Sequence, residues 1–83
     1  MYIHLGTDIT VLKKSITAVI NLEEVPPSDR KVVSFINSED ERGRLQYASE
    51  EVAKTVVITD EGTYMSSLSS NVLQKRLLND DYL

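Results

Sequence analysis

The apolar residues of this chain fall in short runs, and this feature restricts the fold more than any other. No run approaches the roughly 20 residues that a membrane-spanning helix needs. The first residues also lack the charged and apolar regions of a secretory signal. A chain of 83 residues has room for one small core. We therefore expect a single cytoplasmic domain over residues 1–78, followed by a frayed tail over 79–83.

The first 22 residues alternate between apolar and polar positions, as half-buried strands do. Alternating stretches cover 2–5, 9–12 and 16–22. Turn residues at 6–8 and a polar interruption at 13–15 separate them. Short connections of this kind favour antiparallel neighbours. The pattern therefore predicts an N-terminal meander of three strands.

The segment after the prolines at 26–27 predicts a helix. Ser28 is a good N-cap, and the apolar residues within 31–36 are spaced as one helix face. The same six residues are also rich in strand formers, so the local pattern alone leaves helix and strand open. Gly43 suits the position just after a helix and favours a helix over 28–41.

The second half of the chain predicts a hairpin followed by a helix. The β-branched run within 54–59 is typical of a strand buried on both faces. A turn at 60–62 leads to a return strand over 63–66. Serines 69–70 suit the N-cap of a helix over 70–78. Together these elements predict a small α+β fold with a mostly antiparallel sheet and two helices.

The core is expected to use one apolar face of each element. We expect the side chain of Phe35 to be part of this core, so that Phe35→Ala costs about 3–5 kcal/mol. The residues expected to be mostly buried are Ile3, Leu5, Ile9, Val11, Ile16, Ala18, Ile20, Phe35, Ile36, Val56, Ile58 and Leu73.

The reactive residues form no catalytic or metal-binding pattern. The chain has no cysteine and one histidine, His4, which lies mid-strand without a nucleophile beside it. The serines of 66–70 lack a nucleophile elbow or a phosphate loop, and helix capping explains them. The acidic groups at 39–41 and 50–51 lack the spacing of a calcium loop and are expected to be solvated. We expect no enzyme, no catalytic residue, no metal, no cofactor and no small-molecule substrate.

The charge distribution leaves room for one basic patch. The net charge is −4, and residues 37–63 carry the whole acidic excess. A uniform basic coat for nucleic acid is therefore excluded, whereas a local patch is not. The candidate phosphate-contacting residues are Lys14, Lys54, Lys75, Arg76 and Lys13.

Four segments of the chain resemble a known family in their order and spacing. They are Met1-Tyr2-Ile3-His4-Leu5-Gly6, residues 16–23, residues 54–59 and residues 66–76. The chain resembles the bacterial Rem family of extracellular-matrix regulators, and within it the RemB (YaaB-like) branch. The resemblance extends from residue 1 to about residue 77.

The resemblance implies a function. The better-understood RemA branch implies a small α+β subunit, assembly into a ring, DNA binding and activation of biofilm-matrix transcription. Its R-G-x-L stretch after a helix is matched by residues 42–45, and its basic position after the second strand falls at 14–15. Glu51 and Val52 stand near its paired arginines. We therefore expect a DNA-binding regulator that associates with copies of itself into a ring and does not bind membranes. The alternative is an oligomeric scaffold of the same fold that has lost DNA affinity.

Overall fold

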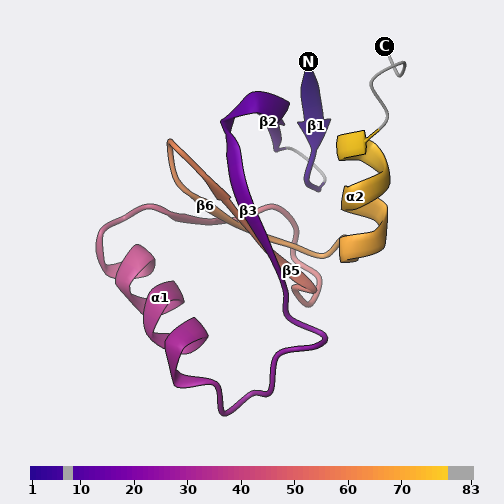
Figure 1. Cartoon of the computed structure of the whole chain (residues 1–83). Coiled ribbons are helices and arrows are strands. Elements are labelled where there is room, and N and C mark those ends of the chain that lie inside the picture. The colour runs from indigo at the N-terminus through magenta and orange to yellow at the C-terminus, as the bar shows by residue number, and fades with distance from the viewer. Residues whose placement is uncertain (7–8, 79–83) are drawn as a thin grey trace.

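Within residues 1–6 and 9–78 the chain folds into two sheets and two helices (Figure 1). The computed structural model describes residues 1–6 and 9–78. The elements in order are β1 (Tyr2–His4), β2 (Thr10–Leu12), the 3-10 turn η1 (Lys13–Ser15), β3 (Ile16–Asn21), α1 (Arg30–Glu41), β4 (Leu45–Tyr47), β5 (Thr55–Thr59), β6 (Thr63–Ser66) and α2 (Ser70–Leu78). The predicted α+β fold is confirmed. The expected tail over 79–83, and two residues of the expected turn at 6–8, lie outside the described residues.

The predicted three-strand meander is wrong at its third strand. β1 and β2 do form an antiparallel hairpin, with Ile3 opposite Val11. β3, however, pairs antiparallel with β5 and not with β2. The turn η1 redirects the chain, and the Ser15 hydroxyl closes this turn by donating to the Leu12 carbonyl at 2.7 Å. The β-branched residues of β5 then offer β3 a longer partner strand than the three-residue β2.

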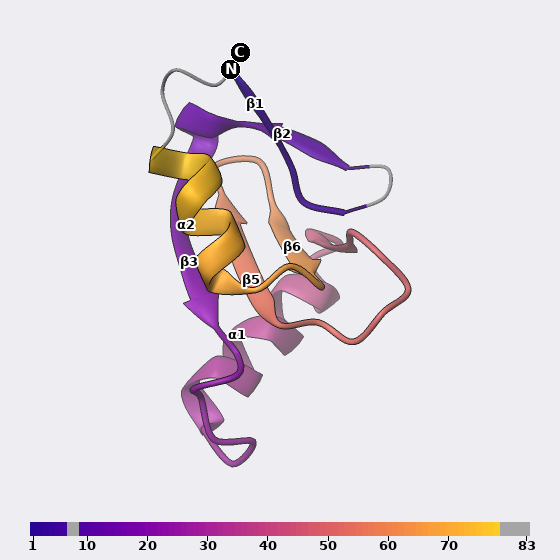
Figure 2. The ribbon, with the colours of Figure 1, turned by 90° about the vertical axis from the view of Figure 1, so that its right-hand side faces the viewer.

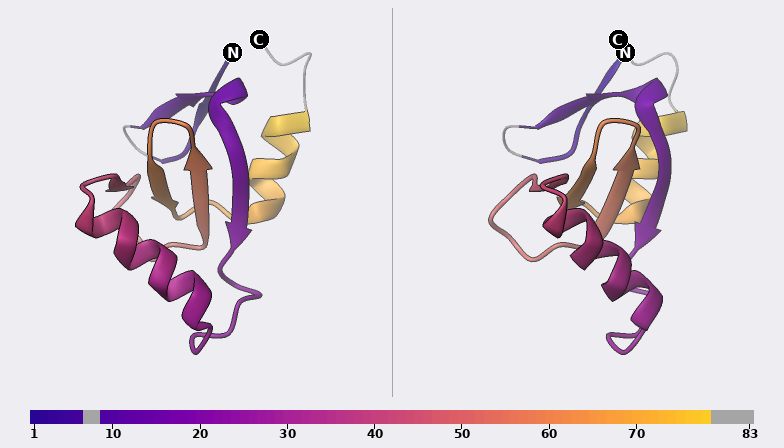
Figure 3. Two further views of the ribbon diagram at one scale, coloured as in Figure 1. Left: turned by 60° about the vertical axis from the view of Figure 1, so that its left-hand side comes forward. Right: turned by 90° about the vertical axis from the view of Figure 1, so that its left-hand side faces the viewer.

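The larger sheet has the strand order β3-β5-β6-β4. β5 and β6 form the predicted hairpin, whose turn at 60–62 is held by the Thr59 hydroxyl, which accepts from the Gly62 N–H at 3.0 Å. β4 pairs parallel with β6 and was not predicted, because three residues give too short an apolar pattern. Figures 2 and 3 show α2 over one face of this sheet and α1 beyond the other.

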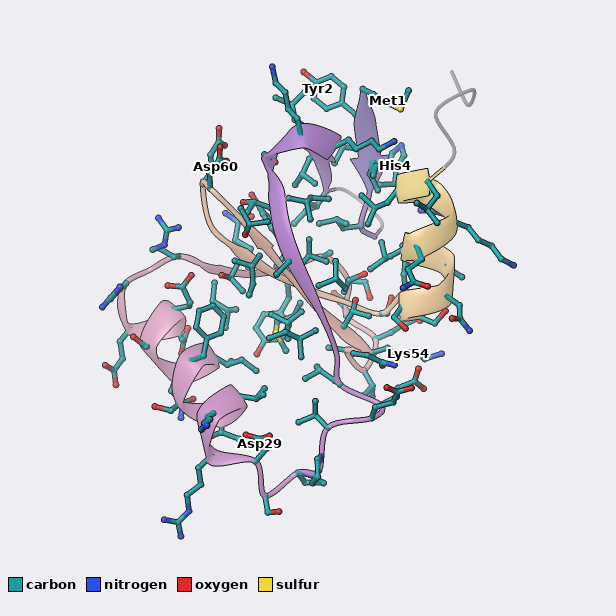
Figure 4. The ribbon with its side chains drawn as sticks, viewed as in Figure 1. Met1, Tyr2, His4, Asp29, Lys54 and Asp60 are labelled. Atoms are coloured by element: carbon teal, nitrogen blue, oxygen red, sulfur yellow. The ribbon has the colours of Figure 1, made fainter. Side chains whose placement is uncertain are left out.

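Both helices are bounded by local capping interactions. The N-cap of α1 is Asp29 rather than the predicted Ser28, because its carboxylate accepts from the N–H groups of Lys31 and Val32 at 3.0 and 3.2 Å. At the other end Gly43 has φ 71°, and the Arg44 N–H donates to the Glu39 carbonyl at 2.9 Å. Figure 4 shows Asp29 at the start of α1. For α2 the predicted serine cap is confirmed, since the Ser69 hydroxyl accepts from Val72 N–H at 3.3 Å.

The core lies between the β1–β2 hairpin, β5 and α2. Its buried apolar residues are Ile3, Leu5, Val11, Ala48, Val57 and Leu73. Val56 and Met65 are also buried, but they pair on the other face of the larger sheet. Of the predicted core, Ile9, Ile16, Ile20, Phe35, Ile36 and Ile58 are only half-buried. The prediction for Ala18 is wrong, because β3 is an edge strand and leaves this side chain exposed. Sequence reasoning missed Ala48, which packs under the hairpin, and Met65, whereas the burial of Val57 agrees with the prediction of a strand buried on both faces within 54–59.

Candidate nucleic-acid interface

A groove of about 470 Å³ runs between β1 and the last turn of α2. Packing positions the helix there: Leu73 is 1% exposed and belongs to the same buried cluster as Ile3 and Leu5. Arg76 then reaches across the groove, and its guanidinium donates to the His4 carbonyl at 2.9 Å. Figure 4 shows His4 beside the upper end of α2. The helix and the strand therefore hold the basic side chain of Arg76 in one place.

The last turn of α2 suits cations electrostatically. Lys75 and Arg76 both lie in this turn, where the negative end of the helix dipole stabilises positive charge. Both side chains are exposed. A guanidinium has five N–H donors, and the bond to His4 uses only some of them. The exposed remainder is placed to meet an anion such as a phosphate.

A second pair of basic residues lies at the other end of β1. The Lys13 N–H donates to the Met1 carbonyl at 2.8 Å, so η1 sits against the start of this strand. Lys14 is exposed. His4 follows Met1 by three residue steps, which span about 10 Å in a strand. The structure thus places Lys13 and Lys14 in the turn η1, beside the start of the strand β1 whose His4 carbonyl accepts from Arg76.

Lys54 lies apart from the other predicted residues. Its N–H donates to the Ser66 carbonyl at 2.7 Å, and its carbonyl accepts from the Leu22 N–H at 2.9 Å. These bonds place it at the Thr55 end of β5, whereas η1 adjoins the Thr59 end. Five strand residues separate the two ends by about 17 Å. Figure 4 shows Lys54 at the end of the sheet away from Met1 and Tyr2. Leu22, which donates to Lys54, is followed in the chain by two acidic residues at 23–24.

Glu39 corrects the expectation that residues 39–41 are a solvated acidic face. Asp40 and Glu41 are exposed, but Glu39 is buried. Its carboxylate accepts from the Thr63 hydroxyl at 2.5 Å and forms an ion pair with Arg44 at 3.5 Å. The Thr63 hydrogen bond, followed by the charge of Arg44, holds the pKa of Glu39 below its ordinary value although burial opposes this. The carboxylate therefore serves to join α1 to β6, far from the basic groove.

The remaining candidate residues have structural partners. The Ser66 hydroxyl is buried and donates to the Leu5 carbonyl at 2.6 Å. Within residues 1–6 and 9–78, no group of three His, Asp or Glu side chains could hold a metal ion. Neither helix in this part of the chain is long and apolar enough to cross a bilayer.

The fold and the groove define a small α+β protein with a basic surface beside its first strand. The chain belongs to the RemA-like family, whose description is extracellular matrix regulatory protein A-like and whose model matches residues 2–77. No curated protein matches the chain. Membership confirms the resemblance at the level of the family, and the description of the family is that of a regulatory protein.

Proposed function

We propose that this protein is a ring-forming, DNA-binding transcriptional regulator of extracellular-matrix genes, of the RemB (YaaB-like) branch. The observation that carries the proposal is the hydrogen bond between Arg76 and the His4 carbonyl. This bond fixes the basic last turn of α2 against β1, and Lys13 adjoins the start of the same strand. Family membership supplies the regulatory context.

The chemistry of this surface favours contacts with the phosphate backbone. Its polar groups are mainly the ammonium groups of Lys14 and Lys75 and the guanidinium of Arg76, which are cations that neutralise phosphates. A net charge of −4 makes long-range attraction to DNA weak. Many copies on one ring compensate, because each further contact forms at high effective concentration. Sequence preference would then come from the shape and bending of the DNA.

The proposed assembly follows from the sheet edges. Among the described residues, β3 and β4 end the larger sheet, and a small domain with open edges gains by covering them with further copies. A head-to-tail contact between copies closes into a ring or grows into a filament. Light scattering at micromolar concentration is expected to give a closed oligomer. A monomer would contradict the proposal.

DNA binding is tested by fluorescence anisotropy with a labelled mixed-sequence duplex over a series of salt concentrations. Lys75→Glu is the preferred variant, because it leaves the contact between Arg76 and His4 in place. We expect affinity to fall at least tenfold and the salt slope to decrease by about 0.9 for each phosphate that the variant no longer neutralises. Lys31→Glu makes the same charge change on the exposed surface of α1 and is expected to have little effect.

The variant Lys54→Glu tests whether the DNA-binding surface includes Lys54 or is limited to the surface around β1. If Lys54 contacts DNA in the assembled ring, its reversal weakens binding as much as that of Lys75. If only the surface around β1 binds, Lys54→Glu resembles Lys31→Glu. Wild-type protein that assembles but has no DNA affinity at low salt would instead favour the oligomeric scaffold without DNA binding.

A further inference from the structure

The outer side of β3 is open along its length. In the part of the chain that the structure describes, β5 is the only strand that pairs with β3. The other side of β3 lines a groove of about 640 Å³, whose opposite wall is α2 with Asn71 and Gln74. Figure 2 shows β3 along one margin of the molecule, with α2 over its face. A further strand could therefore lie beside β3.

The backbone of β3 presents hydrogen-bonding groups to this side. The Leu22 N–H donates to the Lys54 carbonyl next to β5. In an antiparallel ladder, bonded and non-bonded positions alternate, so the N–H groups of Val19 and Asn21 point away from β5. Such an edge is a template for another strand.

The charges that flank β3 select the direction of that strand. Lys13 and Lys14 precede it, and Glu23 and Glu24 follow it. Beside a second β3 running antiparallel, the basic end of each strand meets the acidic end of the other. A parallel arrangement would bring like charges together, which is destabilising. The edge is thus complementary to itself under a two-fold rotation.

We propose that two copies of this chain pair antiparallel through β3, with Val19 at the two-fold axis. This inference rests on the homo-oligomer of the proposed function and identifies one of its contacts. The pairing joins two four-stranded sheets into one and places both α2 helices on the same face. Because a two-fold contact closes after two copies, it joins subunits in pairs, and the whole assembly contains an even number of them.

The same pairing assigns different roles to the basic residues. In this pairing the turn that holds Lys14 lies beside the turn that holds Glu24 of the second copy, so the charge of Lys14 is partly neutralised in the assembly. Lys75 and Arg76 lie on α2 rather than on the pairing edge and remain open to DNA. Substitution of Glu24 therefore acts on self-association, whereas substitution of Lys75 acts on DNA binding.

The test is the mass of the protein without DNA, measured by sedimentation and light scattering over a range of concentrations. Glu24→Lys places like charges together twice in each pair, and we expect self-association to weaken about tenfold or more. The double variant Lys14→Glu with Glu24→Lys exchanges the two signs and is expected to restore it. Glu41→Lys makes the same change on exposed α1 and is the matched control.

A second measurement reports the strand pairing itself. Amide exchange at Val19 is expected to be slow in the wild type and fast in Glu24→Lys, because only pairing occupies this N–H. Three results would overturn the β3 contact alone. The first is that Glu24→Lys associates as strongly as the wild type, and the second is that the double variant fails to reassociate. The third is an odd number of subunits. If the wild type is a monomer, both the β3 contact and the proposed homo-oligomer are overturned. If Lys75→Glu binds DNA more weakly while its mass is unchanged, the β3 contact stands.

Discussion

The Ser66 hydroxyl donates a hydrogen bond of 2.6 Å to the carbonyl of Leu5, 61 positions earlier in the chain. Both residues are fully buried. The same hydroxyl accepts from the Leu68 N–H at 3.1 Å. One side chain thus links the end of β6, the segment leading to α2 and the β1–β2 hairpin. Together with the burial of Ile3, Leu5 and Val11, this link holds the hairpin that forms one side of the basic groove.

Replacing Ser66 tests the link. Ser66→Ala leaves a buried carbonyl without this donor and an N–H without its acceptor, and is expected to cost about 1–3 kcal/mol of unfolding free energy. Ser67→Ala is the control, because its half-buried hydroxyl accepts from the hydroxyl of Ser49 rather than serving a buried backbone group. Urea denaturation measures both. Equal midpoints for the two variants would argue against the link.

Gly6 is expected to tolerate no side chain. A Cβ at this position would overlap the backbone carbonyl of Ala48, which is itself buried. Gly6→Ala must therefore shift the hairpin or the segment at 48, at a cost of about 1–3 kcal/mol. Gly43→Asn is the comparison, since Gly43 has open space around it and asparagine tolerates its positive φ. The thermal unfolding midpoint should be lowered by the first substitution and nearly unchanged by the second.

The apolar residues that pack the two helices against the rest of the protein are expected to contribute different amounts to stability. Leu73 on α2 is 1% exposed, so Leu73→Ala should cost about 2–5 kcal/mol. Phe35 on α1 is only half-buried, and Phe35→Ala should cost less than the about 3–5 kcal/mol of a buried phenylalanine. Chemical denaturation of both variants ranks them. A larger destabilisation by Phe35→Ala would contradict the half-buried position of this ring.

Glu39 makes stability depend on acid pH. The hydrogen bond from Thr63 keeps the pKa of Glu39 lower in the folded chain than in the unfolded chain. Its contribution is therefore complete above the unfolded pKa and is lost as pH falls through the folded pKa. Glu39→Gln removes the titration while keeping an oxygen that accepts from Thr63. Its unfolding free energy should fall less steeply below neutral pH than that of the wild type; identical slopes would contradict the assignment.

Much of the local structure could be predicted from the sequence, because it depends on residues a few positions apart. Gly43 ends α1, Ser69 caps α2, and the turn at 60–62 closes the β5–β6 hairpin. Even the error at the start of α1 is small, since Asp29 follows Ser28 and is equally suited to capping. The basic character of Lys75 and Arg76 was also evident, although not the groove beside them.

Only the tertiary structure decided which distant segments meet. It paired β3 with β5 rather than β2, buried Glu39 against Thr63, and separated Lys54 from the surface around β1. The physical reason is that any β-branched strand can pair with several others, and the choice depends on burial and hydrogen bonding summed over the whole chain. The sequence by itself therefore determined the elements and their caps, whereas their pairing determined which charges share a surface.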